Sequence, residues 1–111
     1  MNTDLTLQRQ GSPILLLAHL HATMQRLPAA SFHVTPVYPT VLEISLHDSL
    51  DAFTAWREAL GLNLSELDAR SHKGSSWVTV DGVVDDVLVR LTGYGDEVEV
   101  AAYQAMSAVA A

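Results

Sequence analysis

Three residues of this chain, His33, Glu43 and His47, have side chains of the types that ligate zinc. Residues 32–47 read as a hairpin that turns near 38–40, and residue parity sets all three on its outward face. They form a candidate polar cluster for a small ligand or an enzyme site. Solvated polar side chains are the commoner arrangement on an outward face. The sequence therefore predicts no bound metal and no cofactor, and it leaves the cluster as an alternative site.

Residues for covalent catalysis are scarce. The chain has no cysteine, which excludes thiolate nucleophiles, cysteine metal sites and disulfides. His47, Asp48 and Ser49 have the residue types of a triad, but a triad depends on geometry, and adjacent residues at a strand end point in different directions. Neither a G-x-S-x-G elbow nor an H-E-x-x-H helix occurs. We therefore expect no catalytic residues and a protein that is not an enzyme.

A hairpin over residues 76–94 is the strongest local pattern in the chain. With Asp85 and Asp86 as the turn, one face pairs apolar residues such as Val80 and Leu91. The opposite, mixed face pairs Trp77 with Tyr94, Thr79 with Thr92, and Asp81 with Arg90. A slip by one residue would scramble both faces, so the pattern predicts one register.

A strand over residues 66–72 extends the mixed face. A turn at Lys73 and Gly74 sets Arg70 opposite Trp77. The mixed face then holds an aromatic pair flanked by arginines, a composition typical of the centre of a protein interface. The interface candidates are Arg70, Trp77, Asp81, Arg90 and Tyr94.

Three amphipathic helices are expected around these strands. Ser12 and Pro13 suit the N-cap and first position of a helix that ends at Pro28. Ser49 suits the N-cap of a second helix, which stops at Gly61. A third, C-terminal helix has the expected inward stripe Val98, Ala102, Ala105 and Val109.

The order of elements is α-β-β-α-β-β-β-α, which indicates an α+β two-layer sandwich. We expect an antiparallel sheet of about five strands with the helices on one face. Pro36 cannot donate to a strand ladder, so the first strand is expected at an edge. Residues 12–111 are predicted to form a single α+β domain, and residues 1–11 a flexible N-terminal arm.

Composition narrows the class of partner. The formal net charge of −7 over 111 residues argues against nucleic acid, because phosphate contacts require clustered Lys and Arg. No apolar run approaches the roughly 20 residues of a membrane span, so we expect no membrane association. The lack of cysteine suits a reducing interior, and we expect a cytoplasmic location. One lysine beside five arginines, with abundant alanine and valine, favours a bacterial, phage or plasmid genome.

These features favour a non-catalytic module for protein–protein interaction or regulation, with a homodimer as the first form to test. One alternative is a small-ligand-binding protein or enzyme that uses the polar cluster His33, Glu43 and His47. Another is an inhibitor of a host protein, encoded by a mobile element. No residue pattern separates these hypotheses, because function depends on sites rather than on fold class.

Overall fold

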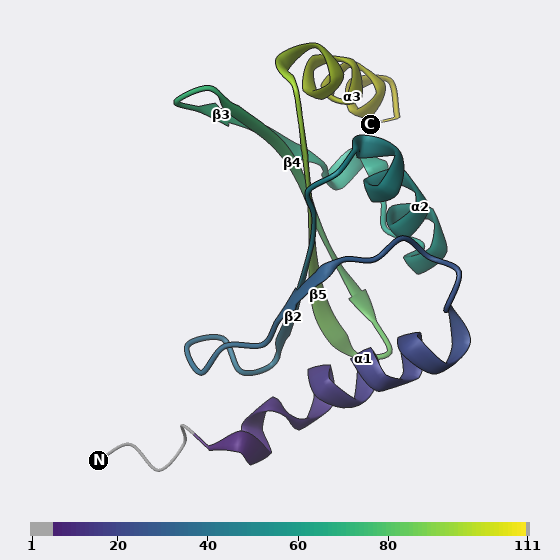
Figure 1. The fold of residues 1–111 in the computed structure, drawn as a ribbon, viewed down its shortest axis with the longest axis vertical. Helices are drawn as coiled ribbons and strands as arrows, with labels where there is room; N and C mark the ends of the chain where they lie inside the picture. Colours follow the sequence, from purple (N-terminus) through teal and green to yellow (C-terminus); the bar gives the residue numbers. More distant parts are fainter. Residues whose placement is uncertain (1–5, 111) are drawn as a thin grey trace.

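Five strands form one sheet, and three helices lie against one of its faces in the computed structural model, which describes residues 6–110 (Figure 1). No described element covers the other face. In chain order, the elements are the 3-10 helix η1 (Leu7–Gln10), α1 (Gly11–Thr23), β1 (Ser31–His33), β2 (Val41–Leu46), α2 (Leu50–Leu60), the 3-10 helix η2 (Leu64–Glu66), β3 (Asp68–His72), β4 (Ser75–Val84), β5 (Val87–Gly95) and α3 (Glu97–Ala110).

The predicted α+β class, two-layer arrangement and element order are confirmed, with one correction to the sheet. The strands lie in the order β1-β2-β5-β4-β3, and β2 runs parallel to β5 while the other pairs are antiparallel. The sheet is therefore mixed rather than wholly antiparallel. A parallel pair requires a crossover connection, and here α2, β3 and β4 supply it. β1 lies at an edge, as Pro36 predicts.

The predicted strand register is confirmed. Arg70 pairs with Trp77 across β3 and β4, and Trp77 pairs with Tyr94 across β4 and β5. Asp85 and Asp86 have φ angles of 49° and 63°, the left-handed values that a tight two-residue hairpin turn needs at both positions. Short polar side chains tolerate this region better than bulky ones do.

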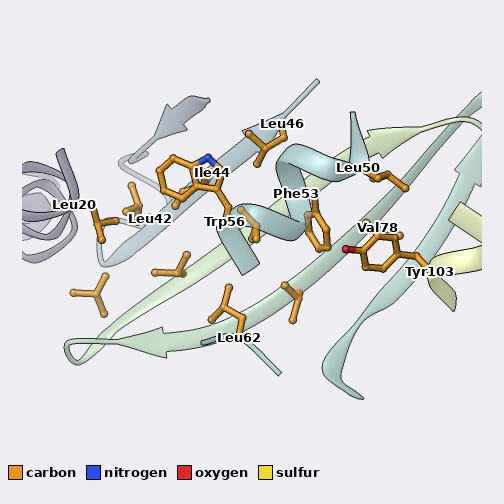
Figure 2. Packing of buried hydrophobic residues seen from close by; sticks show 14 of the residues in the cluster. Leu20, Leu42, Ile44, Leu46, Leu50, Phe53, Trp56, Leu62, Val78 and Tyr103 are labelled. Atoms are coloured by element: carbon orange, nitrogen blue, oxygen red, sulfur yellow. The ribbon is translucent and has the colours of Figure 1, made fainter. Parts of the chain in front are cut away.

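The core lies between the sheet and the helices (Figure 2). The side chain of Phe53 from α2 is fully buried, and the indole Nε1 of Trp56 donates a hydrogen bond of 2.8 Å to the carbonyl of Pro28. The most buried strand residues are Leu42, Ile44, Leu46, Val78, Val80, Val89 and Leu91. Inward residues thus alternate with outward ones along each central strand.

The predicted ends of α2 are confirmed. The Ser49 hydroxyl accepts a hydrogen bond from the backbone N–H of Ala52, and Gly61 follows the helix with a φ of 67°. Among residues 6–110, no helix combines the length and the apolar character that a membrane crossing requires.

The start and end of α1 differ from the prediction. The helix begins at Gly11, directly after η1, so Ser12 lies inside it rather than at its N-cap. The Gln10 side chain instead donates a hydrogen bond to the carbonyl of Val34 and ties this end to the start of the sheet. The helix also ends at Thr23, before Pro28. A flexible arm over 1–11 stays a prediction, because residues 1–5 lie outside the described part of the chain.

The predicted inward stripe of α3 is wrong. Val98 and Val109 are 79% and 88% exposed, and the buried face holds Val100, Tyr103 and Ser107 instead. The Tyr103 ring packs edge-on against Phe53 with 5.4 Å between centroids. An aromatic ring buries far more area than a row of alanines, and this contact sets the rotation of the helix.

Candidate functional site

The side of the sheet turned away from the helices, here called the outer face, carries both sets of residues that the sequence singled out. Strand parity turns Trp77, Asp81, Arg90 and Tyr94 away from the core. Because β2 lies beside β5, the residues of the first hairpin share this face. Register aligns the outer face into a charged row, a hydroxyl row and an aromatic row, each of which crosses several strands.

The charged row crosses β1, β2, β5 and β4. His33 pairs with Glu43, Glu43 lies beside Arg90, and Arg90 pairs with Asp81. The Arg90 guanidinium donates two hydrogen bonds to the Asp81 carboxylate, at 3.0 and 3.2 Å. These hydrogen bonds and the charge of Asp81 raise the pKa of Arg90 above its ordinary value. Arg90 is therefore a fixed, permanent cation at the middle of the face.

The aromatic row crosses β5, β4 and β3, four residues from the charged row, with Tyr94 in β5 and Trp77 in β4. The His47 imidazole stacks on the Tyr94 ring, with centroids 4.8 Å apart and planes within 9°. Trp77 lies next, with its ring centroid 6.1 Å from that of Tyr94. Arg70 pairs with Trp77 in the register, and its Nε donates a hydrogen bond of 2.7 Å to Asp68. Three rings thus form a continuous strip, in which Trp77 and Tyr94 are half-buried and His47 is exposed.

The hydroxyl row lies between the other two. Ser45 lies beside Thr92, and Thr92 pairs with Thr79. The two threonine hydroxyls are 3.2 Å apart and hydrogen-bonded. A depression of about 290 Å³ lies at Thr79, on the β3–β4–β5 side of the face. Its lining residues are Glu66, Asp68, Arg70, Trp77, Thr79, Asp81 and Arg90.

The alternative cluster of His33, Glu43 and His47 is not brought together. His33 lies opposite Glu43, but His47 lies four residues further along and stacks on Tyr94 in the aromatic row. Within residues 6–110, no group of three or more histidine and acidic side chains is placed to hold a metal ion. The five interface candidates, in contrast, form one connected patch.

Sequence reasoning missed that the two sets share a face. His47 joins Tyr94, and Glu43 joins Arg90, only because β2 and β5 are neighbours. The opposite charges of Glu43 and Arg90 were a usable signal, although many other pairs in the chain have equally compatible charges. No family model matches this chain, and no curated protein or solved structure matches it either.

Proposed function

We propose that this protein is a non-catalytic interaction module that associates with a second copy of itself through the outer face. The observation that carries the proposal is the strip of three rings beside the charged row, on a sheet face that no described helix covers. Aromatic residues and arginine are enriched where proteins bind one another. The arginines on this face are already paired with acids, which lowers the cost of removing them from water.

A dimer with two-fold symmetry needs a surface that complements itself. The hydroxyl row lies midway between the charged and aromatic rows, so a two-fold axis along it exchanges these two rows. Tyr94 of one copy then lies over Arg90 of the other, and His47 lies over Glu43. A ring over a guanidinium and an imidazole over a carboxylate are favourable contacts.

The alternative stacking is less favourable. An axis along β5 would set Arg90 over Arg90 and bring Asp81 near Glu43, both pairs of like charge. Charge complementarity thus selects the arrangement in which the strands of the two copies run in opposite directions. Sheets stacked face to face keep an angle of roughly 30°, so the central strands make the closest contacts.

The test is a charge placed on the proposed axis. Thr92→Arg would face its own copy across the dimer, and we expect the dimer dissociation constant to rise by about tenfold or more from repulsion and lost packing. The matched control is Val109→Arg, which adds the same charge near the C-terminal end of α3, in the helical layer, at a position that is 88% exposed. Sedimentation equilibrium over a range of protein concentrations measures both, and circular dichroism checks folding.

A strictly monomeric wild type at high concentration would overturn the dimer. Equal dimer dissociation constants for the wild type and Thr92→Arg would show that the outer face is not the dimer interface. The wild type could instead be monomeric and co-purify with a host protein that the Trp77→Ala variant no longer binds. That result would assign the same face to a different partner, as the mobile-element inhibitor hypothesis predicts.

A further inference from the structure

An apolar groove of about 580 Å³ lies between α1, residues 24–30 and β1. Trp56 and Phe32 contribute rings to its lining, edge-on to each other with centroids 5.8 Å apart. In Figure 2, Leu20 from α1 and Trp56 from α2 lie on either side of Leu42. The groove is on the helical side of the sheet, away from the outer face, and no sequence pattern predicted it.

Part of the apolar stripe of α1 lines this groove instead of entering the core. Leu16 and Leu20 are buried, with 4% and 2% of their surface exposed. Leu17 and Met24 are only half-buried, and Ile14 is 42% exposed. All three line the groove. Covering these side chains with an apolar occupant would be favourable, because it removes apolar surface from water.

The lining carries no formal charge. None of its residues is Asp, Glu, Lys or Arg, in a chain that has 13 acidic and 6 basic residues. His21 and Gln25 supply polar side chains. The indole N–H of Trp56 is already satisfied by the carbonyl of Pro28, so it is not available to a ligand.

We propose that this groove binds a small, uncharged, mainly apolar molecule that carries one hydrogen-bonding group. Its volume falls within the range of roughly 300–1,000 Å³ that is usual for small-molecule pockets. An ionised ligand would lose its hydration without gaining a partner of opposite charge, which is strongly unfavourable. One polar group can be met by His21 or Gln25.

A peptide or a second copy fits the groove less well than a small molecule does. A polypeptide brings one N–H and one carbonyl with nearly every residue, and each needs a partner when it is buried. The groove offers the side chains of His21 and Gln25 for that purpose, and the carbonyl of Pro28 already accepts a hydrogen bond. The proposal of a small-molecule ligand in this groove does not depend on the outer face or on the dimer proposed for it.

The probe for the test is the uncharged fluorophore N-phenyl-1-naphthylamine. A Trp77→Phe background leaves Trp56 as the only tryptophan, so energy transfer to the probe reports on the groove itself. We expect saturable binding in this background. The sulfonated analogue 8-anilinonaphthalene-1-sulfonate should bind about tenfold more weakly or worse, because its charge would be buried without a partner.

Two matched pairs of variants locate the site. Ala18→Phe fills the groove and should weaken binding by about tenfold or more, whereas Ala22→Phe adds the same ring to an exposed part of α1 outside the lining. Ile14→Glu places a carboxylate in the lining, whereas Leu15→Glu places it at a neighbouring position that is 71% exposed. Thermal melts by circular dichroism would check that all four variants fold.

Absence of saturable binding to folded protein overturns the proposal, as does equal binding to the filled and control variants. Equal affinity for the sulfonated analogue overturns the uncharged class of ligand. If Ile14→Glu dissociates a dimer that Thr92→Arg leaves intact, the groove is an interface between copies, and the proposal is also overturned. A monomeric protein that still binds the probe at this site supports the groove while contradicting the proposed dimer.

Discussion

The two faces of β4 and β5 share one backbone and one register, yet they have opposite properties. Val78, Val80 and Leu91 on the inner face are fully buried. On the outer face, Asp81 and Arg90 keep 44% and 49% of their side-chain surface exposed. Alternation along a strand therefore separates the residues that stabilise the fold from those that face solvent. Substitutions at neighbouring residues should have very different consequences.

The largest contrast is expected between Leu91→Ala and Thr92→Ala. Leu91 is fully buried, so its truncation should lower the free energy of unfolding by about 2–5 kcal/mol. Thr92→Ala removes one hydrogen bond on the half-exposed outer face and should cost less than about 1 kcal/mol. Urea unfolding at one fixed protein concentration measures both. Similar losses in the two variants would contradict the division of roles between the faces.

A close approach at Gly93 gives the second contrast. A Cβ at this position would lie 2.7 Å from the Cβ of Phe53, so Gly93→Ala should lower the free energy of unfolding by about 1–3 kcal/mol. Gly11→Ala is the control, since its Cβ would meet open space at the first residue of α1, and it should change the free energy of unfolding by less than about 0.5 kcal/mol. Thermal and urea melts give both values, and a neutral Gly93→Ala would mean that α2 can move off β5 at little cost.

Tyr103 adds a titratable group to the buried side of the sheet. Burial raises the pKa of Tyr103, and the nearby Arg57 guanidinium partly opposes that rise. The pKa of Tyr103 in the folded protein therefore lies above the unfolded value of about 10. Its contribution to the free energy of unfolding is fully present below about pH 10 and is lost as pH rises through the folded pKa.

Tyr103→Phe tests this linkage. At neutral pH the free energy of unfolding of the variant should be lower by about 1 kcal/mol, because the hydroxyl of Tyr103 is hydrogen-bonded to that of Thr54. Above about pH 10, the stability of the wild type should fall more steeply than that of the variant. Urea unfolding from pH 7 to 11 measures the difference, and parallel curves would show that Tyr103 contributes no pH dependence.

The smallest effect is expected at the outer charged row. Asp81→Asn removes one partner of an exposed ion pair and should change the free energy of unfolding by less than about 1 kcal/mol. The change should shrink further in 1 M salt, where the screening length is about 3 Å. Asp68→Asn tests the second exposed pair in the same way. A loss as large as that of Leu91→Ala would make the outer face part of the stabilising core.

The hairpins and α2 were predictable because their signals are local. Cross-strand pairs such as Trp77 with Tyr94 fix a register once the turn is known, and Ser49 and Gly61 mark the ends of one helix within a few residues of chain. The rotation of α3 was not predictable in this way. Its exposed residues, Val98 and Val109, are as apolar as its buried ones, so its faces are distinguished by tertiary contacts such as that between Tyr103 and Phe53.

The sequence by itself determined the class of fold, the order of elements and which residues of β3, β4 and β5 share a face, because strand alternation and tight turns act over a few residues. Tertiary structure decided that β2 lies parallel to β5, which sets His47 against Tyr94 and joins two separate candidate sets on one surface. It also decided that part of the α1 stripe lines a groove. Both outcomes depend on packing between elements far apart in the chain, and local patterns carry little information about such contacts.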